Sequence, residues 1–165
     1  RESLIKLNNF KIIQDNESKS NNEIRITSGI NIITAGQAVY DESGGLITVS
    51  KGVTLENPNL FVEGQEALIN TDDETATLKN ADYFFPTIPA RGSSEEFRIE
   101  QGNEYILINP TYSTCNQLDQ SWELVADEIL LKGDEGVAKN IGLRFKNIPI
   151  LFLPRLTFPT NEDRK

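Results

Sequence analysis

The sequence predicts an all-β domain built from stacked antiparallel strand pairs, and three observations support this class. Apolar and polar residues alternate with a period of two in runs such as 23–27 and 46–49. Clusters of Gly, Pro, Asn and Asp recur between these runs, as turns do. One strand-turn-strand layout occurs four times. The 165 residues are the length of one domain with a sizeable core.

The turn clusters divide the chain into short strands. They lie at 15–18, 41–45, 56–59, 71–74 and 133–136. This spacing is typical of an all-β sandwich or roll. We therefore expect antiparallel strands between them, without a helix longer than two turns.

The segment 118–131 fits two interpretations by periodicity alone. Leu118, Trp122, Val125 and Ile129 have the spacing of an amphipathic helix. The same segment also fits two short strands with alternating faces. Because this segment forms part of the fourth repeat, the internal repetition favours strands.

Each repeat carries a Gly or Asn with an aromatic residue or Leu three positions later. These residues are Gly52, Asn80, Asn109 and Asn140, at spacings of 28, 29 and 31 residues. Gly and Asn tolerate left-handed backbone, so each is expected to mark a bulge or bend. Repeats this short cannot bury a face alone, so they are expected to stack as two facing sheets.

The last apolar run, 148–158, is expected to be extended or irregular. Pro149 and Pro154 lie within it and Pro159 follows it. Proline donates no ladder hydrogen bond and breaks helices. The run is also far shorter than the roughly 20 residues that a membrane helix needs.

Composition excludes several classes of function. There is no His and one Cys, which excludes histidine-based catalytic triads, a zinc cluster and an internal disulfide. The formal net charge of −9 argues against a nucleic-acid partner, because phosphate binding needs a basic face. Neither a metal nor a cofactor is expected, and of the familiar chemistries only paired carboxylates remain.

Five segments resemble one family. They are AGQAVYD at 35–41, ARG at 90–92, NPTYSTC at 109–115, SWEL at 121–124 and IPILFLP at 148–154. The first resembles the OstA-like repeat of lipopolysaccharide (LPS) transport proteins, although Gly36 replaces the usual Asp. Together the five are similar to the periplasmic N-terminal domain of the LPS-assembly outer-membrane proteins, the LptD family. The resemblance extends from about Ile24 to the end of the chain.

This resemblance implies an open antiparallel β-jellyroll, or β-taco, that conducts LPS and is not an enzyme. It implies a jellyroll over 23–146, an unassigned segment at 1–22, and a Pro-rich connection at 147–165 towards a transmembrane barrel. The domain is then expected on the periplasmic side of the outer membrane. The implied partners are LPS, through its lipid A acyl chains, an LptA-like bridge protein added at an edge strand, and an LptE-like lipoprotein with the barrel.

The candidate lipid groove consists of apolar residues on the expected strands, although a packed core explains each of them as well. Which strand face points inward is left open, because a bulge between Ala35 and Ala38 switches it. The candidates are Ile33, Tyr40, Val53, Leu55, Val62, Ile69, Tyr83, Phe97, Trp122, Leu124, Leu131 and Leu143.

Cys115 has two interpretations. A lone cysteine is often a small buried hydrophobic residue. The resemblance implies instead a disulfide to a cysteine of the barrel, outside this chain.

Two other functions remain open. One is a soluble LptA-like bridge protein, against which the run at 148–159 argues. The other is a carbohydrate-active β-roll enzyme with two carboxylates, which requires a groove lined by carboxylates and aromatic residues. The acidic clusters at 72–74, 94–96 and 134–135 are expected to be solvated turns.

Overall fold

The computed structural model describes residues 2–7, 10–15, 23–41, 43–87, 89–102, 104–114 and 121–159, with residues 2–15 at the level of the backbone. These residues form strands and turns only, and all strand pairs are antiparallel. The expected all-β class is confirmed. Nothing in the described part of the chain is a helix that could cross a membrane.

In chain order the strands are β1 (Glu2–Leu7), β2 (Phe10–Asp15), β3 (Glu23–Ser28), β4 (Asn31–Ala35), β5 (Gln37–Asp41), β6 (Leu46–Asn57), β7 (Leu60–Asn70), β8 (Thr75–Phe85), β9 (Ala90–Glu100), β10 (Glu104–Ile108), β11 (Thr111–Tyr112), β12 (Trp122–Val125), β13 (Glu128–Lys132), β14 (Glu135–Phe145) and β15 (Ile148–Pro159).

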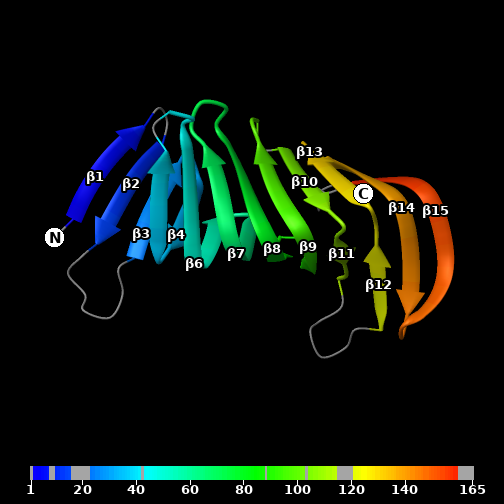
Figure 1. Cartoon of the computed structure of the whole chain (residues 1–165). Coiled ribbons are helices and arrows are strands. Elements are labelled where there is room, and N and C mark those ends of the chain that lie inside the picture. Colours follow the sequence, from blue (N-terminus) through cyan, green and yellow to red (C-terminus); the bar gives the residue numbers. More distant parts are fainter. Residues whose placement is uncertain are drawn as a thin grey trace.

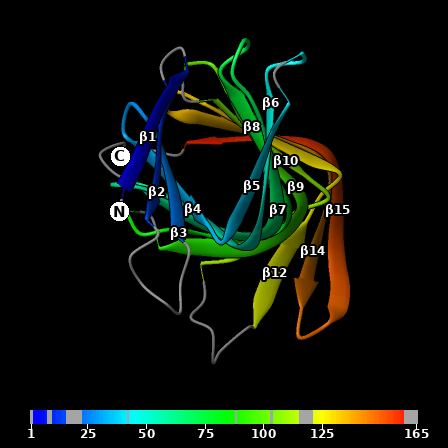
Figure 2. The same cartoon turned by 60° about the vertical axis from the view of Figure 1, so that its left-hand side comes forward.

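The described strands belong to one continuous sheet. Its main path runs β1-β2-β3-β4-β6-β7-β8-β9-β10-β13-β14-β12-β11, while β5 pairs with β6 and β15 with β14 (Figure 1). The sheet curls, and β3 and β4 come to face β8 and β9 (Figure 2). The two facing sheets expected from the sequence are thus two halves of one sheet, which together form the open antiparallel β-jellyroll.

The core lies inside the curl and follows the alternation of the long strands. On β7, Leu60, Val62, Ala67 and Ile69 are buried, and their neighbours point outward. Four rings from β8, β9 and β10 pack together, with centroids 5.6 to 6.4 Å apart. Each large apolar side chain that is removed from water stabilises the fold by about 1.5–3 kcal/mol.

The predicted bends of the repeat are confirmed. Gly52, Asn80, Asn109 and Asn140 all have positive φ, at 73°, 51°, 49° and 53°. The ladder of β6 with β7 shifts register between Ser50 and Val53, around the first of them. The bends at Asn80 and Asn140 switch the alternation, so that even-numbered residues are buried before them and odd-numbered residues after them, whereas the residues buried on both sides of Gly52 keep one parity.

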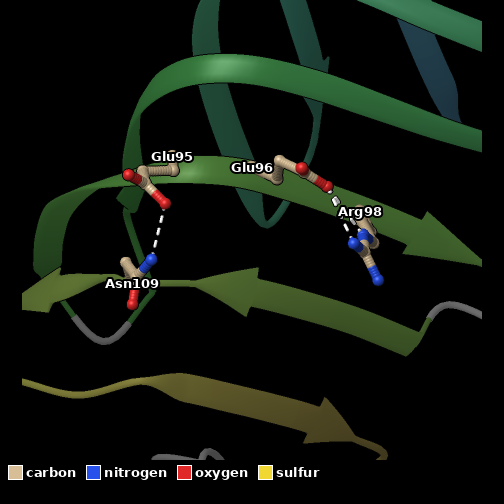
Figure 3. A network of polar contacts seen from close by, with 4 residues as sticks. All are labelled: Glu95, Glu96, Arg98 and Asn109. Atoms are coloured by element: carbon tan, nitrogen blue, oxygen red, sulfur yellow. Dashed lines mark hydrogen bonds and ion pairs between the residues drawn. The ribbon is translucent and has the colours of Figure 1, made fainter.

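The three asparagine bends share one side-chain contact. Each Asn donates from Nδ2 to an acceptor on the preceding segment, 13 to 15 residues earlier. The pairs are Asn80 with Gln65 at 3.0 Å, Asn109 with Glu95 at 2.5 Å, and Asn140 with Asp127 at 2.8 Å. Figure 3 shows the second pair, beside the ion pair of Glu96 with Arg98 at 2.9 Å. The amide therefore stabilises the bend that its own backbone makes.

Both uncertain segments of the sequence are extended. Within 118–131, the described residues contain β12 and the start of β13, as the repeat predicts. The run at 148–158 forms β15, and its prolines fall at irregular points of its ladder. Pro149 lies at a register shift, and Pro154 is opposite the Asn140 bend, where pairing is interrupted.

Ladder pairing continues on both sides of the domain limits expected at residues 22 and 146. β2 pairs with β3, and β14 pairs with β15 along most of its length. The limits themselves stay predictions.

Candidate functional site

Most of the candidate groove residues lie together inside the curl. Ile33, Val53, Leu55, Val62, Ile69, Tyr83, Phe97 and Leu131 belong to one buried cluster, and Leu124 packs against it. Their lipid-binding role stays a prediction, since a core residue and a groove residue share this position.

Three candidates lie apart from that cluster. Tyr40, near the end of β5, is 41% exposed. Trp122 and Leu143, on β12 and β14, are half-buried and do not belong to the cluster. The short strand β12 pairs along the far end of β14, which places Trp122 beside Phe145 and away from the centre of the curl.

On β8, the inward residues that the sequence list missed follow from the bend at Asn80. On β8, Ala76 and Leu78 are buried before Asn80, while Ala81, Tyr83 and Phe85 are buried after it. The face therefore switches at the bend. Starting from Tyr83, this switch places Phe85 and Leu78 on the inward face as well.

The interior is almost entirely apolar. Among the described residues, the buried polar side chains are Thr71, Ser94 and Ser113, and no charged side chain is buried. No three His, Cys, Asp or Glu side chains in the described ranges could hold a metal ion together. Within the part of the chain that the structure describes, the interior is therefore apolar apart from a few hydroxyl groups.

The two halves of the sheet meet over a small cavity of about 30 Å³. Ile26, Ile33 and Leu55 line it from β3, β4 and β6. Ala76 and Ile99 line it from β8 and β9. The apolar interior is thus nearly filled by its own side chains where the halves face each other.

A polar contact also joins the two halves. Asn57 at the end of β6 donates from Nδ2 to Asn31 Oδ1 at 2.8 Å and lies 3.5 Å from the Tyr105 hydroxyl of β10. The second distance is at the outer limit for a hydrogen bond, so this link across the opening is weak.

At the opposite end of the strands, β11 lies directly against the start of β9. Arg91 and Ser113 exchange backbone hydrogen bonds of 2.8 and 2.9 Å. The Tyr83 hydroxyl donates to the Thr111 carbonyl. Burial raises the pKa of Tyr83 well above its usual range, and the neighbouring Tyr112 and Glu123 raise it further. Tyr83 therefore acts as a neutral hydrogen-bond donor that holds β11 in place.

Cys115 lies outside the described residues, so its disulfide stays a prediction. The nearest described residue is Thr114, which is exposed and follows the bridge between Ser113 and Arg91.

Comparison with known proteins finds curated relatives that share one name, LPS-assembly protein LptD. No family model matches the chain. The LPS-assembly protein LptD of Pseudoalteromonas atlantica is 32% identical over 160 residues, which are 96% of this chain and 21% of that protein. The LPS-assembly protein LptD of Thiobacillus denitrificans is 34% identical over 128 residues, which are 76% of this chain and 18% of that protein. The chain thus spans about a fifth of the length of these curated relatives.

Among solved structures, one similar chain is LptH of Pseudomonas aeruginosa, described as the LptA homologous periplasmic component of the conserved lipopolysaccharide transport device. The TM-score is 0.49 at 13% identity, and the match covers 62% of this chain and 75% of that chain.

Proposed function

Because the chain belongs to the LptD family of LPS-assembly proteins, of which it spans about a fifth, we propose that it is a lipid-conducting domain. The acyl chains of LPS pass along the inside of the curled sheet towards the remainder of the protein. The domain lies on the periplasmic side of the outer membrane, where it receives LPS from an LptA-like bridge.

The apolar interior is the observation that carries this proposal. Inward-facing aliphatic and aromatic side chains follow one another from β3 to β14, with no buried charge among the described residues. Moving an acyl chain out of water is favourable by about 0.8 kcal/mol per CH₂. The inside of the curl has no buried carboxylate among the described residues, so it does not provide the carboxylate-lined groove that a carbohydrate-active enzyme needs.

Lipid entry requires the two halves of the sheet to separate. The cavity of about 30 Å³ between Ile33 and Ile99 has room for about one water molecule and cannot hold an acyl chain. The contacts that must break there are apolar packing and the weak Asn57–Tyr105 link of 3.5 Å. An acyl chain that enters replaces the same apolar contacts, so opening is compensated by lipid burial.

The proposed partners follow from the ends of the sheet. In the described part of the chain, β1 pairs only with β2, so its other edge has free backbone donors and acceptors. An LptA-like bridge is proposed to add a strand at this edge, as sheets do in β-augmentation. An LptE-like lipoprotein is proposed to act with the part of the relatives that this chain does not span.

Photo-crosslinking in cells tests the path. A photoreactive residue is placed at buried Ile33 or Ile69, and at the outward neighbours Thr34 or Asn70 as matched controls. Successive side chains of a strand point to opposite faces, so LPS capture is expected at the first pair and not at the second. If LPS were captured equally at both members of each pair, the conducting path would be contradicted, and the domain would serve only to dock its partners.

Ile69→Asp is expected to lower LPS transport to the cell surface. Ile69 is fully buried, and an unpaired carboxylate in an apolar path has a desolvation cost of several kcal/mol. Asn70→Asp, on the opposite face of β7, is the control and is expected to leave transport unchanged. Circular dichroism of both variants checks that the sheet still forms, and normal transport by a folded Ile69→Asp would contradict the path.

A further inference from the structure

A second, much larger cavity lies on the outer face of the sheet. It has a volume of about 490 Å³ and is formed by β7, β8 and β9, with β11 and β12 at its side. Val62 and Tyr83 are buried, so their neighbours on β7 and β8 point to this outer face. The size lies in the usual range of small-ligand pockets.

Two cross-strand rows form the floor of this outer cavity. In the first row, Phe61, Phe84 and Arg91 lie side by side on β7, β8 and β9. The second row is Glu63, Asp82 and Ser93 on the same strands. Trp122 and Glu123 of β12 line the cavity from the side. The site therefore combines flat apolar surfaces with charged groups of both signs.

Arg91 lines this cavity with its guanidinium packed over the Phe84 ring. Its guanidinium carbon lies 5.2 Å from the centre of the Phe84 ring. Its Nε is buried and has no hydrogen-bond partner. A ligand in the cavity can instead reach the outer N–H groups of the guanidinium, for which no ion pair is found among the described residues.

Two carboxylates of the cavity, Glu63 and Asp82, form no ion pair with another residue that the structure describes. Glu63 and Asp82 are exposed and directly opposite each other on neighbouring strands, which is an unfavourable arrangement of like charges. Among the described residues, ion pairs join Arg98 with Glu96, Lys132 with Glu104, and Lys139 with Glu128. Glu63 and Asp82 are thus free to accept hydrogen bonds from a ligand.

A ligand matched to these groups must donate and accept hydrogen bonds and present flat apolar faces. A phosphate satisfies Arg91 but meets the carboxylates. A basic peptide segment satisfies the carboxylates but leaves the Arg91 guanidinium unpaired and adds like charge beside it. A neutral sugar ring has hydroxyl groups that both donate and accept, and C–H faces that pack on Phe61 and Trp122.

We propose that the outer cavity between β7–β9 and β12 binds a saccharide, as a site for the sugar part of the transported glycolipid. The proposal rests on the conducting role proposed above, because that role supplies a ligand with both sugars and acyl chains. Sugar binding outside the curl and acyl binding inside it are two separate contacts.

The single tryptophan of the chain supplies the assay. The probe is N,N′-diacetylchitobiose, a neutral disaccharide without acyl chains, added to the whole chain while Trp122 fluorescence is followed. A saturable change is expected. Asp82→Asn and Arg91→Gln each remove one charged hydrogen-bonding group, and each is expected to weaken binding about tenfold or more. Glu100→Gln, at the far end of β9, is the control and is expected to bind like the wild type.

Other outcomes overturn the proposal. These are no saturable change, equal weakening by Glu100→Gln, or tighter binding of tri-lysine or of inorganic phosphate at the same residues. Crosslinking of LPS at Ile33 and Ile69 reports the inner path independently. Loss of sugar binding with intact crosslinking contradicts this proposal alone, whereas intact sugar binding without crosslinking contradicts the conducting role alone.

Discussion

Replacing Gly92 by alanine is expected to detach β11 from β9. Gly92 pairs with Tyr83 on β8, and its missing side chain leaves space that β11 occupies. A Cβ at this position would overlap the carbonyl oxygen of Thr111 and stand 2.5 Å from the Tyr83 hydroxyl. Real Cβ atoms essentially never approach closer than 3.0 Å, and the obstacle is backbone, so β11 must move.

The size of the effect follows from the contacts that this movement breaks. Three hydrogen bonds end on Thr111. The Tyr83 hydroxyl donates to its carbonyl, the Ser93 backbone donates to its hydroxyl at 2.9 Å, and the Ser93 and Thr111 hydroxyls are bonded at 3.2 Å. Each contributes about 1 kcal/mol. Overpacking costs about 1–3 kcal/mol more. We expect the free energy of unfolding to fall by about 4–6 kcal/mol, which for a chain of this length lowers Tm by roughly 8–24 °C.

Urea unfolding followed by Trp122 fluorescence and by circular dichroism measures this loss. Gly44→Ala is the matched control, because its Cβ would meet only ordinary contacts at 3.7 Å or more. If Gly92→Ala unfolds within about 0.5 kcal/mol of the wild type, as surface substitutions do, then β11 does not lie against β9 as described.

Two further predictions concern Asn140 and Tyr83. Asn140→Ala is expected to lower the free energy of unfolding, measured in urea, by about 1–2 kcal/mol, because Asn140 has a φ of 53° and donates a hydrogen bond to Asp127. Asn140→Gly keeps the backbone freedom at this position, so it is expected to lower the free energy of unfolding by less. An unchanged stability of the alanine variant would contradict the role of the bend. The raised pKa of Tyr83 means that the folded state keeps a proton that the unfolded state releases above about pH 10. Thermal stability is therefore present below that pH and falls as the pH rises beyond it; Tyr83→Phe should show a shallower alkaline decline, and an equal decline would exclude this residue as its cause.

The local features of the fold could be predicted because they depend on neighbouring residues. Asn80, Asn109 and Asn140 adopt left-handed backbone because the asparagine side chain tolerates it, and each then reaches an acceptor on the adjacent segment. The prolines of β15 likewise favour an extended strand at an edge of the sheet, because proline donates no ladder hydrogen bond.

The candidate site could be predicted only in part. Val62 and Ile69 were both among the candidate groove residues, and both are fully buried, although the inward face of their strand could not be chosen from the sequence. Tyr40 shares the pattern but is exposed, because β5 lies off the main path of the sheet and has only β6 as its ladder partner. The outer cavity was not foreseen, since Phe61, Arg91 and Trp122 come together only through pairing between distant strands.

The sequence alone therefore determined the strand class, the repeat and its bends, because turn chemistry and side-chain alternation act over a few residues. The tertiary structure decided which apolar residues share one interior and how nearly that interior is closed. Those properties depend on the curl of one sheet and on contacts such as that of Gly92 with Thr111, which join residues far apart in the chain. A period of two places a side chain on one of two faces, and only the path of the sheet decides what each face meets.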